Sequence, residues 1–445
     1  MAAKIREKER SAILSSLGAG VVPAIGLQHV QVGRKSEIEA LLGDLRRAES
    51  GGAGIRFIVG RFGSGKSFFL NLVQTVAMER RFAVMRADIT VDRRLTGSNG
   101  VARSLYGELA RNIATRSRPE GQAMGNIVER WVGELAHEVH SEGGSDEDVE
   151  SRIKSDLRPL QELVSGDDFA AVLAAYYRGH ATHDAPLQDA AIRWLRAEYR
   201  TKTEARRDLG VRTIIDDESS YDYLKLMAAF VRLAGYSGLL VCLDALVVLS
   251  HRLNNRTSRD RNYEAILRIL NDCLQGSVEG LMFLLAATDD CLTDTRRGLF
   301  SYEALATRLA DNRFAVDGLT DLSGPVIRLE NLTPEDCYVL LSNVRRVFVR
   351  GGDGASVLPD EAIERYLASC NERMGASYFQ TPRETIKDFV GLLNVLEQNP
   401  EADWARLIGG LTTTAGSEDL GEPVDDDEPA ATATPDDDDL ATFKL

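Results

Sequence analysis

Short apolar runs alternate along the chain with longer stretches in which apolar residues recur at helical spacing. Five runs are short and contain few polar positions, which is typical of strands buried on both faces of a sheet. They lie at 55–59, 82–88, 239–244, 280–289 and 326–329. Helical patterns fill the intervals, so we expect an α/β protein with a parallel sheet and flanking helices.

The second and third runs are too far apart in the sequence for a minimal α/β core. The intervening residues 97–222 have a helical pattern, few β-branched runs and one acidic, breaker-rich stretch at 141–149. This pattern indicates an inserted helical subdomain, because long loops without secondary structure are uncommon in compact domains. After Leu332 the pattern is helical again, starting with an N-cap, a proline and an acidic first turn at 333–336.

These shifts divide the chain into five parts. Residues 1–96 hold an N-terminal segment and the first part of the core, 97–222 the insertion, 223–330 the second part of the core, 331–412 a helical lid, and 413–445 a tail. The tail carries much of the net charge of −15, because Ser417–Leu445 contains eleven acidic residues and one lysine. It is expected to be disordered, since it has few apolar residues. Its role is to keep the protein soluble or, alternatively, to dock a partner or mimic DNA.

Composition narrows the class of protein. The 445 residues are 44% hydrophobic and 27% charged, which are ordinary globular proportions. No apolar run approaches the roughly 20 residues of a membrane span, and the charged N-terminal sequence is unlike a signal peptide. The five cysteines are odd in number and lack CxxC spacing, which favours neither disulfides nor zinc. We therefore expect a cytoplasmic protein with no membrane partner.

The most informative segment is 55–70, which reads IRFIVGRFGSGKSFFL. It matches GxxxxGKS between a predicted strand and a helix that begins near Lys66, the context that this phosphate-binding loop requires. Glycines let backbone N–H groups curl around phosphates, and the helix N-terminus adds partial positive charge. The expected nucleotide-binding residues are Gly60, Gly63, Ser64, Gly65, Lys66, Ser67 and Phe68. The expected cofactors are ATP, with Lys66 at its β- and γ-phosphates, and Mg²⁺, held by the Ser67 hydroxyl.

A magnesium-dependent nucleotide hydrolase also needs a strand that ends in an acidic residue. Five apolar residues, 239–243, are followed by Asp244 at the carboxyl end of a predicted strand, where α/β sheets place ligands. Asp244 is thus the second expected metal-binding residue. Most AAA+ ATPases have glutamate at the next position to activate water, whereas this chain has Ala245, which cannot accept a proton. Either the protein is naturally a poor hydrolase, or the alanine was introduced to trap bound nucleotide.

Further positions resemble the order of motifs in AAA+ ATPases. Thr288 ends the fourth predicted strand at the sensor 1 position, although a threonine there also caps turns. Arg308 and Arg313 precede the last strand, where these ATPases present an arginine finger to a neighbouring subunit; surface salt bridges are the alternative. Arg383 follows a proline as in the sensor 2 helix, or starts a helix paired with a carboxylate.

Upstream of the loop, the segment 32–42 resembles the entry that packs beside adenine in AAA+ ATPases. It contains Gly33 and Arg34, followed by an amphipathic helical pattern with apolar residues at 38, 41, 42 and 45. Gly33 and Arg34 are therefore added to the expected nucleotide-binding residues.

Two basic clusters are candidates for contact with the DNA backbone. One has arginines at helical spacing on one face with aromatic residues nearby, a pattern that a solvated helix face also shows. The other lies in a polar stretch, 251–261, expected to be a loop directly after the strand that ends at Asp244. The expected contacts are Arg193, Arg196 and Arg200 in the first cluster, and Arg252, Arg256 and Arg259 in the second.

Three stretches outside these motifs carry a more specific resemblance. Asn262–Gly276, Asp294–Leu305 and Leu329–Asp336 are similar to the ATP-binding proteins of BREX-type bacteriophage-exclusion systems, and the similarity extends over about residues 20–400. The resemblance implies an AAA+-like ATPase of a prokaryotic anti-phage defence system, acting on DNA beside a helicase. That family has Asp-Glu where this chain has Asp244-Ala245, which favours the nucleotide trap.

Two classes of function remain open at this point. One is a DNA-associated ATPase that forms a homo-oligomeric ring or filament. The other is a nucleotide-gated adaptor of the STAND kind, which assembles protein partners with little turnover.

Overall fold

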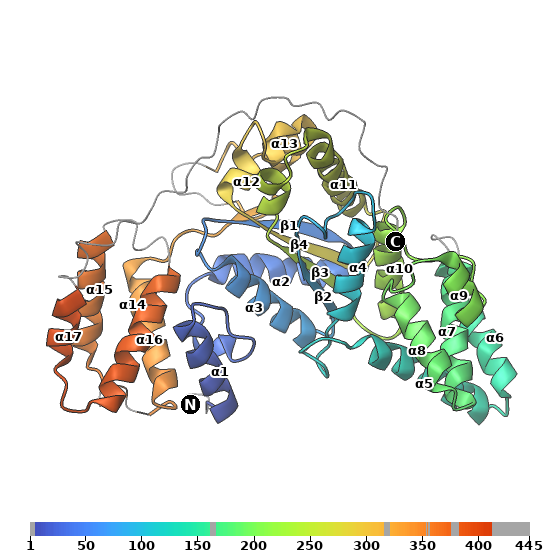
Figure 1. Ribbon diagram of the computed structural model, residues 1–445, viewed down its shortest axis with the longest axis horizontal. Coiled ribbons are helices and arrows are strands. Elements are labelled where there is room, and N and C mark those ends of the chain that lie inside the picture. Colours follow the sequence, from blue (N-terminus) through green and yellow to red (C-terminus); the bar gives the residue numbers. More distant parts are fainter. Residues whose placement is uncertain are drawn as a thin grey trace, which may run out of the picture.

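The computed structural model describes residues 5–411 except 161–165, 316–320, 353, 355–356 and 375–381. A parallel sheet lies at its centre (Figure 1). The sheet has five strands in the order β2-β3-β4-β1-β5. The strands are β1 (Gly54–Val59), β2 (Ala83–Asp88), β3 (Leu239–Asp244), β4 (Leu281–Ala287) and β5 (Val326–Arg328). Each predicted strand is present, with ends moved by no more than two residues, and the predicted α/β class is confirmed.

Helices cover both faces of the sheet. α2 (Lys35–Glu49) and α3 (Lys66–Glu79) pack on the face that includes Ile58 and Leu240. α4 (Val101–Arg111), α10 (Ser220–Leu233) and α11 (Arg256–Gln275) pack with the other face, which includes Phe57 and Val241. Successive strand residues point to opposite faces, and helices cover both faces. The central strands are therefore buried almost throughout, which explains their unbroken apolar runs.

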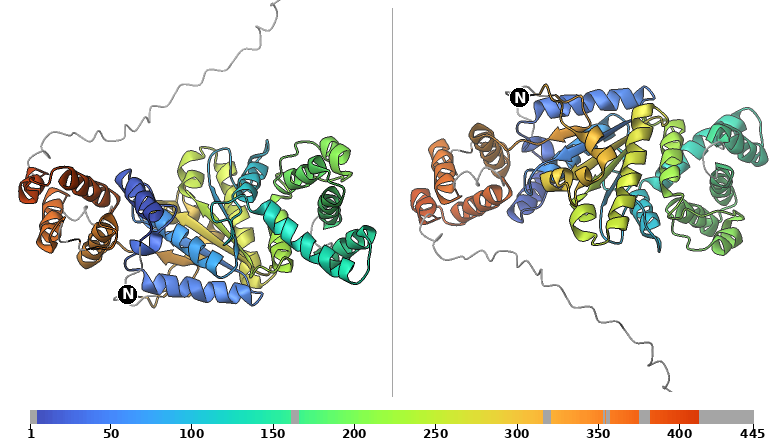
Figure 2. Two further views of the ribbon diagram at one scale, coloured as in Figure 1. Left: turned by 90° about the horizontal axis from the view of Figure 1, so that it is seen from below. Right: turned by 90° about the horizontal axis from the view of Figure 1, so that it is seen from above.

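The chain between β2 and β3 is helical, as its sequence pattern predicts. Between α4 and α10 it forms α5 (Met124–Ser141), α6 (Asp146–Asp156), η2 (Arg158–Leu160), α7 (Gly166–Ala181), α8 (Ala185–Leu195) and α9 (Lys202–Leu209). These helices lie at one end of the molecule (Figures 1 and 2). Their packing includes edge-to-face ring contacts of Trp131 with Phe230 and of Trp194 with Tyr223, and their core is continuous with the core under the sheet.

A second group of helices lies at the opposite end of the molecule (Figures 1 and 2). It contains α14 (Pro334–Phe348), α15 (Asp360–Met374), α16 (Pro382–Gln398) and α17 (Trp404–Leu411). The N-terminal helix α1 (Glu7–Gly18) packs into this group, because Ile13 and Leu17 share a buried cluster with Leu341 and Phe389. The sequence pattern places the N-terminal segment with the first part of the core and does not predict this association.

The segment after β3 differs from its prediction. Residues 251–261 were expected to form a polar loop, but they contain the end of η3 (Val248–Arg252), a turn of π-helix, and the start of α11. Asn255 caps α11, since its side chain accepts a hydrogen bond from the backbone N–H of Ser258. The prediction is wrong because high polarity is compatible with an exposed first turn of a helix when a capping residue such as asparagine precedes it.

The remaining short elements connect these layers. They are η1 (Leu27–His29), α12 (Asp289–Thr293), η4 (Leu299–Ser301) and α13 (Glu303–Leu309). Among the described residues, no helix is both long enough and apolar enough to cross a bilayer. The predicted tail, 413–445, lies outside the described residues.

Candidate nucleotide-binding site

The loop between β1 and α3 has the geometry of a phosphate cradle. Gly63 and Gly65 adopt left-handed backbone conformations, with φ of +79° and +91°, which glycine adopts without steric cost. A Cβ atom at Gly60 would lie 2.7 Å from the Ser64 hydroxyl oxygen and 3.3 Å from the carbonyl oxygen of Leu329. The loop therefore needs glycine at Gly60 for space and at Gly63 and Gly65 for backbone conformation.

The Ser64 hydroxyl supports the fit of a polar ligand to this loop. Its oxygen is buried and has no hydrogen-bond partner among the described residues. A buried polar atom without a hydrogen-bond partner costs free energy of folding, so this hydroxyl is suited to form a hydrogen bond with a bound ligand.

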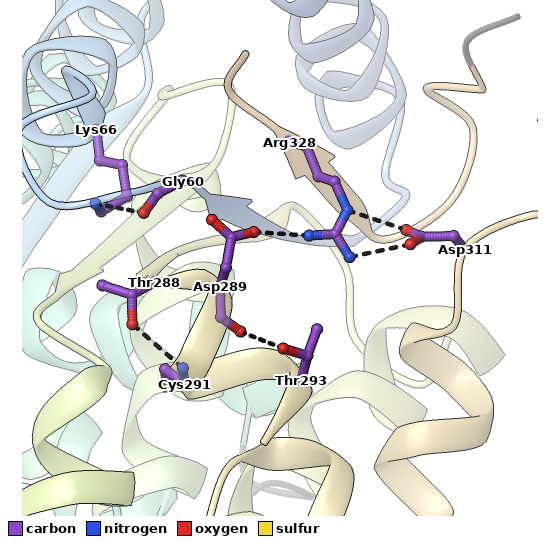
Figure 3. Close-up of polar contacts among 8 residues, drawn as sticks. All are labelled: Gly60, Lys66, Thr288, Asp289, Cys291, Thr293, Asp311 and Arg328. Atoms are coloured by element: carbon purple, nitrogen blue, oxygen red, sulfur yellow. Dashed lines mark hydrogen bonds and ion pairs between the residues drawn. The ribbon is translucent and has the colours of Figure 1, made fainter. Parts of the chain in front are cut away.

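Lys66, the first residue of α3, folds back over the loop. Its Nζ atom donates a hydrogen bond of 2.8 Å to the carbonyl oxygen of Gly60 (Figure 3). It donates a second one, of 2.7 Å, to the carbonyl oxygen of Arg61. Burial lowers the pKa of the Lys66 ammonium, and the nearby carboxylates of Asp244 and Asp289 oppose that shift. The two carbonyl oxygens thus hold the Nζ atom at the cradle, where phosphates would bind.

Ser67 and Asp244 form the contact expected of a magnesium site. The Ser67 hydroxyl donates a 2.7 Å hydrogen bond to Oδ2 of Asp244, so the N-terminus of α3 and the end of β3 meet. A hydroxyl and a single carboxylate fit Mg²⁺, which keeps several waters and is held by few protein ligands beside substrate phosphates. The described residues contain no cluster of three or more His, Cys, Asp or Glu side chains arranged to hold a metal ion.

Asp88 is a site residue that the sequence patterns did not predict. It ends β2 and pairs in register with Asp244 at the end of β3, and both side chains line the same cavity. Burial raises the pKa of Asp88, and the like charge of Asp244 raises it further. The available signal was an acidic residue at the end of a predicted strand, but only the strand order makes it a neighbour of Asp244.

Ala245 has an uncommon backbone conformation. Its φ is +59°, which is rare for a residue with a Cβ atom, and its N–H donates a 2.7 Å hydrogen bond to Oδ1 of Asp244. The methyl group lines the cavity and offers no proton acceptor. Ala245, which stands where a glutamate is expected, therefore lies directly beside the Ser67–Asp244 contact.

The cavity at this site has a volume of about 380 Å³ and lies between the sheet and the C-terminal helical group. Its polar part consists of the loop and the strand ends. Its apolar part includes Val21, Val32, Leu340 and Ile386, which come from the N-terminal segment, α14 and α16. A cavity with one charged end and one apolar end suits a nucleotide, whose phosphates and base differ in the same way.

The two residues upstream of the loop differ in position. Arg34 lines the cavity, and its guanidinium donates to the carbonyl oxygen of Glu330 and lies 3.5 Å from a carboxylate oxygen of Glu37. Burial lowers the pKa of Arg34, and Glu37 opposes the shift. Gly33 is absent from the described lining; its φ is +62° and a Cβ atom there would be 3.4 Å from the Asp336 carboxylate. Gly33 thus shapes the turn, while Arg34 is at the cavity.

Thr288 and Arg383 both line the cavity. The Thr288 hydroxyl accepts a 3.2 Å hydrogen bond from the N–H of Cys291, so it caps α12, as the alternative interpretation proposed, while remaining at the cavity wall (Figure 3). The Arg383 guanidinium lies 5.0 Å from the ring centroid of Phe62 in the loop. The C-terminal helices therefore touch the phosphate-binding loop directly.

Arg308 and Arg313 lie outside the described cavity lining. Arg308 donates a 3.0 Å hydrogen bond to the Asn271 side chain and another to the carbonyl oxygen of Ala304 in its own helix. Arg313 is exposed and has no hydrogen bond or ion pair with the described residues. Their action on a neighbouring subunit stays a prediction.

The two basic clusters are rearranged by the fold. Arg193, Arg196 and Arg200 do not share a helical face, because α8 ends at Leu195 and Ala197 has a φ of +56°. Arg193 lies over the Tyr199 ring, at 4.8 Å from its centroid.

In the second cluster, Arg259 is buried, and it donates to the carbonyl oxygens of Leu253 and Asn254 at 2.8 and 3.1 Å. Its assignment to DNA is wrong, since these contacts stabilise the turn before α11. Arg252 and Arg256 are exposed.

The parallel sheet, the glycine-rich loop ahead of α3 and the Ser67–Asp244 contact together define an α/β nucleotide-binding protein of the P-loop class. A family model described as BREX system ATP-binding protein BrxC/D matches residues 5–411. The chain belongs to this family, and the resemblance inferred from the sequence is confirmed. No curated protein matches the chain.

Proposed function

We propose that the chain is an AAA+-like ATPase subunit that binds ATP and Mg²⁺ in the cavity described above, and that ATP promotes its assembly into a ring or filament. In this proposal it acts on DNA together with a helicase and other proteins of the defence system. The observation that carries it is the Ser67–Asp244 contact, with Lys66 held over the adjacent glycine loop.

Each group has a chemical role in this proposal. Lys66 and the N–H groups of the loop bind the phosphates, while Ser67 and Asp244 hold the metal ion, which stabilises charge on the phosphates. Thr288 and Arg383 approach the phosphates from the wall of the cavity. The apolar residues near Arg34 surround the base.

The C-terminal helices α14–α17, together with α1, act as the lid in this proposal. Support comes from Leu340, Ile386 and Arg383, which contribute to the cavity from α14 and α16. Because the cavity lies between this group and the sheet, a nucleotide bound there would contact both. Changes in its phosphates would therefore alter the position of the helices.

Hydrolysis is expected to be slow in this chain. Ala245 offers no carboxylate to take a proton from water, and the neighbouring Asp244 is engaged by Ser67 and by the N–H of Ala245. The protein should therefore hold ATP·Mg²⁺ much longer than a subunit with glutamate at this position.

Light scattering with and without ATP tests the proposed assembly. The parent should grow in mass with ATP, because a guanidinium from a neighbour adds charge-assisted hydrogen bonds to the γ-phosphate. Arg308→Ala or Arg313→Ala should bind ATP normally but fail to assemble. Lys35→Ala, which changes an exposed lysine paired with Glu39, is the control. A parent that stays monomeric with ATP and with duplex DNA would rule out the ring or filament.

The proposed DNA contact is tested at Arg252 and Arg256, which are exposed in the segment after β3. Removal of an arginine that binds a phosphate should weaken binding to duplexes of any sequence. It should also reduce the slope of the logarithm of the binding constant against the logarithm of the salt concentration by about one. The comparison is Arg152→Ala, which removes an arginine paired with Asp156 in α6. Equal DNA affinity of the parent and the Arg252→Ala/Arg256→Ala variant would contradict this interaction.

The second candidate function is a nucleotide-gated adaptor. Ala245 favours it, since a site that binds but scarcely hydrolyses ATP suits a switch. Tight nucleotide retention with a protein partner, together with no affinity for DNA, would support the adaptor over the motor.

A further inference from the structure

Arg328 occupies an unusual position at the end of the edge strand β5. It pairs in register with Val59, the last residue of β1 before the phosphate-binding loop. Its guanidinium binds two carboxylates at once, as Figure 3 shows. Nη1 lies 2.8 Å from Oδ1 of Asp289, while Nη2 and Nε lie 3.0 and 3.4 Å from the two carboxylate oxygens of Asp311.

The first carboxylate belongs to the nucleotide site. Asp289 follows Thr288, the residue at the cavity wall, and begins α12. Its charge also acts on Lys66, where it opposes the effect of burial on the lysine pKa. Asp289 thus follows a residue of the cavity wall and binds Arg328 on β5.

The second carboxylate belongs to a surface segment, 311–315, that follows α13. Near Asp311 in this segment stand the exposed Arg313 and Phe314, and Phe314 is 84% exposed. A hydrogen bond of 3.0 Å from the N–H of Phe314 to the Asn312 side chain folds the segment back on itself. A large aromatic residue this exposed, beside a cation, is suited to contact another protein surface.

We propose that Arg328 is a positioning residue that couples the nucleotide site to the segment 311–315. The Asp289 carboxylate responds to the charge at the nucleotide site, and Arg328 fixes the position of the Asp311 carboxylate. This inference rests on the proposed function, since it assumes phosphates at Lys66. Neither Arg328 nor Asp289 is among the described residues that line the cavity. Arg328 therefore acts through its neighbours and does not contact the ligand.

The coupling follows from the charges. Phosphates at Lys66 compete with Asp289 for the lysine charge, and the Asp289 carboxylate then interacts more strongly with Arg328. Arg328 in turn holds Asp311 through two parallel contacts, so a shift of the guanidinium changes the position of the segment that carries Arg313. Such a relay requires arginine, because a planar fork contacts two carboxylates in fixed directions whereas lysine is a point charge.

Stability alone does not explain this arrangement. The Arg328 side chain is one-third exposed and that of Asp311 is mostly exposed, and ion pairs with this exposure add little to stability. The effect of Arg328 should therefore appear in the position of the segment and not in the melting temperature.

The test compares Arg328→Lys with Arg178→Lys. Arg178 makes a similar two-pronged contact, at 2.9 and 2.6 Å to the two carboxylate oxygens of Glu150, but lies in α7 and outside the cavity lining. Hydrogen exchange of the backbone amides in 310–315 is measured with and without ATP·Mg²⁺, and ATP affinity is measured by calorimetry. A second variant, Asp311→Asn, breaks the link from the other side.

We expect ATP to slow exchange in 310–315 at least threefold in the parent and in Arg178→Lys. Arg328→Lys and Asp311→Asn should lose this effect while their ATP affinity stays within twofold of the parent. ATP protection of 310–315 that persists in Arg328→Lys, or is absent in the parent although it binds ATP, would overturn the proposal. Loss of ATP affinity in Arg328→Lys would also overturn it, because Arg328 would then be a binding residue. Failure of the parent to bind ATP would instead refute the proposed function itself.

Discussion

Ser67 and Asp244 are 177 positions apart in the sequence, and the Ser67 hydroxyl donates a 2.7 Å hydrogen bond to the Asp244 carboxylate. The contact joins the start of α3 to the end of β3, two strands away from the strand that leads into the loop. It brings a hydroxyl and a carboxylate together at the edge of the sheet where the glycine loop also lies. The two residues proposed to hold the metal ion therefore line the same cavity as the loop proposed to bind phosphates.

Replacement of Lys66 by alanine should abolish ATP binding. The change removes the main cation for the β- and γ-phosphates, together with the two hydrogen bonds that hold the side chain over the loop. Calorimetric titration with ATP·Mg²⁺ measures the effect, and circular dichroism checks that the variant is folded. Lys35→Ala, at an exposed position in α2, should bind like the parent. Unchanged affinity in Lys66→Ala would refute the assignment of the loop.

Replacement of Ala245 by glutamate should raise ATP turnover by about 10²–10⁴-fold, the usual effect of a general base. The new carboxylate would stand at the cavity wall next to Asp244. Ala245→Gln is the matched control, because it has the same length but cannot accept the proton, and it should stay as slow as the parent. Phosphate release under saturating ATP is the measurement. If glutamate and glutamine gave the same rate, another residue would be the base or the protein would be a true non-hydrolysing switch.

The buried ion pair between Asp44 and Arg56 should be important for stability. Their side chains are only 4% and 7% exposed, and Nε of Arg56 lies 2.6 Å from Oδ2 of Asp44, which ties α2 to β1. Asp44→Asn leaves a buried guanidinium without its counter-charge, so the free energy of unfolding should fall by about 3–5 kcal/mol. Urea denaturation measures this loss.

Glu49→Gln supplies the comparison for this pair. It breaks a partly exposed contact, 2.8 Å between Glu49 and Arg80, which also joins α2 to a neighbouring segment. An exposed pair contributes at most about 1 kcal/mol, so the loss should be small. Equal losses in Asp44→Asn and Glu49→Gln would show that burial of the Asp44 pair has no special effect.

The thiols should be inert in the folded protein. All five cysteines are buried, and burial raises the pKa of Cys273 and of Cys291 to about 12 and that of Cys337 to about 11. Only the thiolate reacts, and at pH 8 a thiol of pKa 12 is ionised in about one molecule in ten thousand. A thiol-reactive dye at pH 8 should therefore label no cysteine in the native protein and all five in denaturant. Rapid labelling of the native protein would show that a cysteine is accessible.

Much of the site could be predicted from the sequence because its signals are local. The strand, glycines and lysine of the loop are contiguous, and the order of apolar residues before Asp244 marks a buried strand with an acidic end. The spacing of apolar residues, which is also a local signal, predicted the helices after Leu332 and the helical stretch between β2 and β3. Ala245 could be identified as a departure from related proteins because it directly follows Asp244, where those proteins have glutamate.

The tertiary structure decided which distant residues meet. The strand order places Asp88 beside Asp244, and packing places α1 with α14–α17. Neither pairing has a local pattern, since each depends on how whole elements are arranged.

Side-chain direction was likewise decided by the fold. Arg259 points into the protein because two carbonyl groups at the turn before α11 need a donor, and the helix that would have aligned Arg193 with Arg200 ends at Leu195. Arg328 meets two carboxylates only because β5 lies beside β1. The sequence determines which groups are available and the local segments they form; the contacts between segments depend on burial and hydrogen bonding throughout the folded chain.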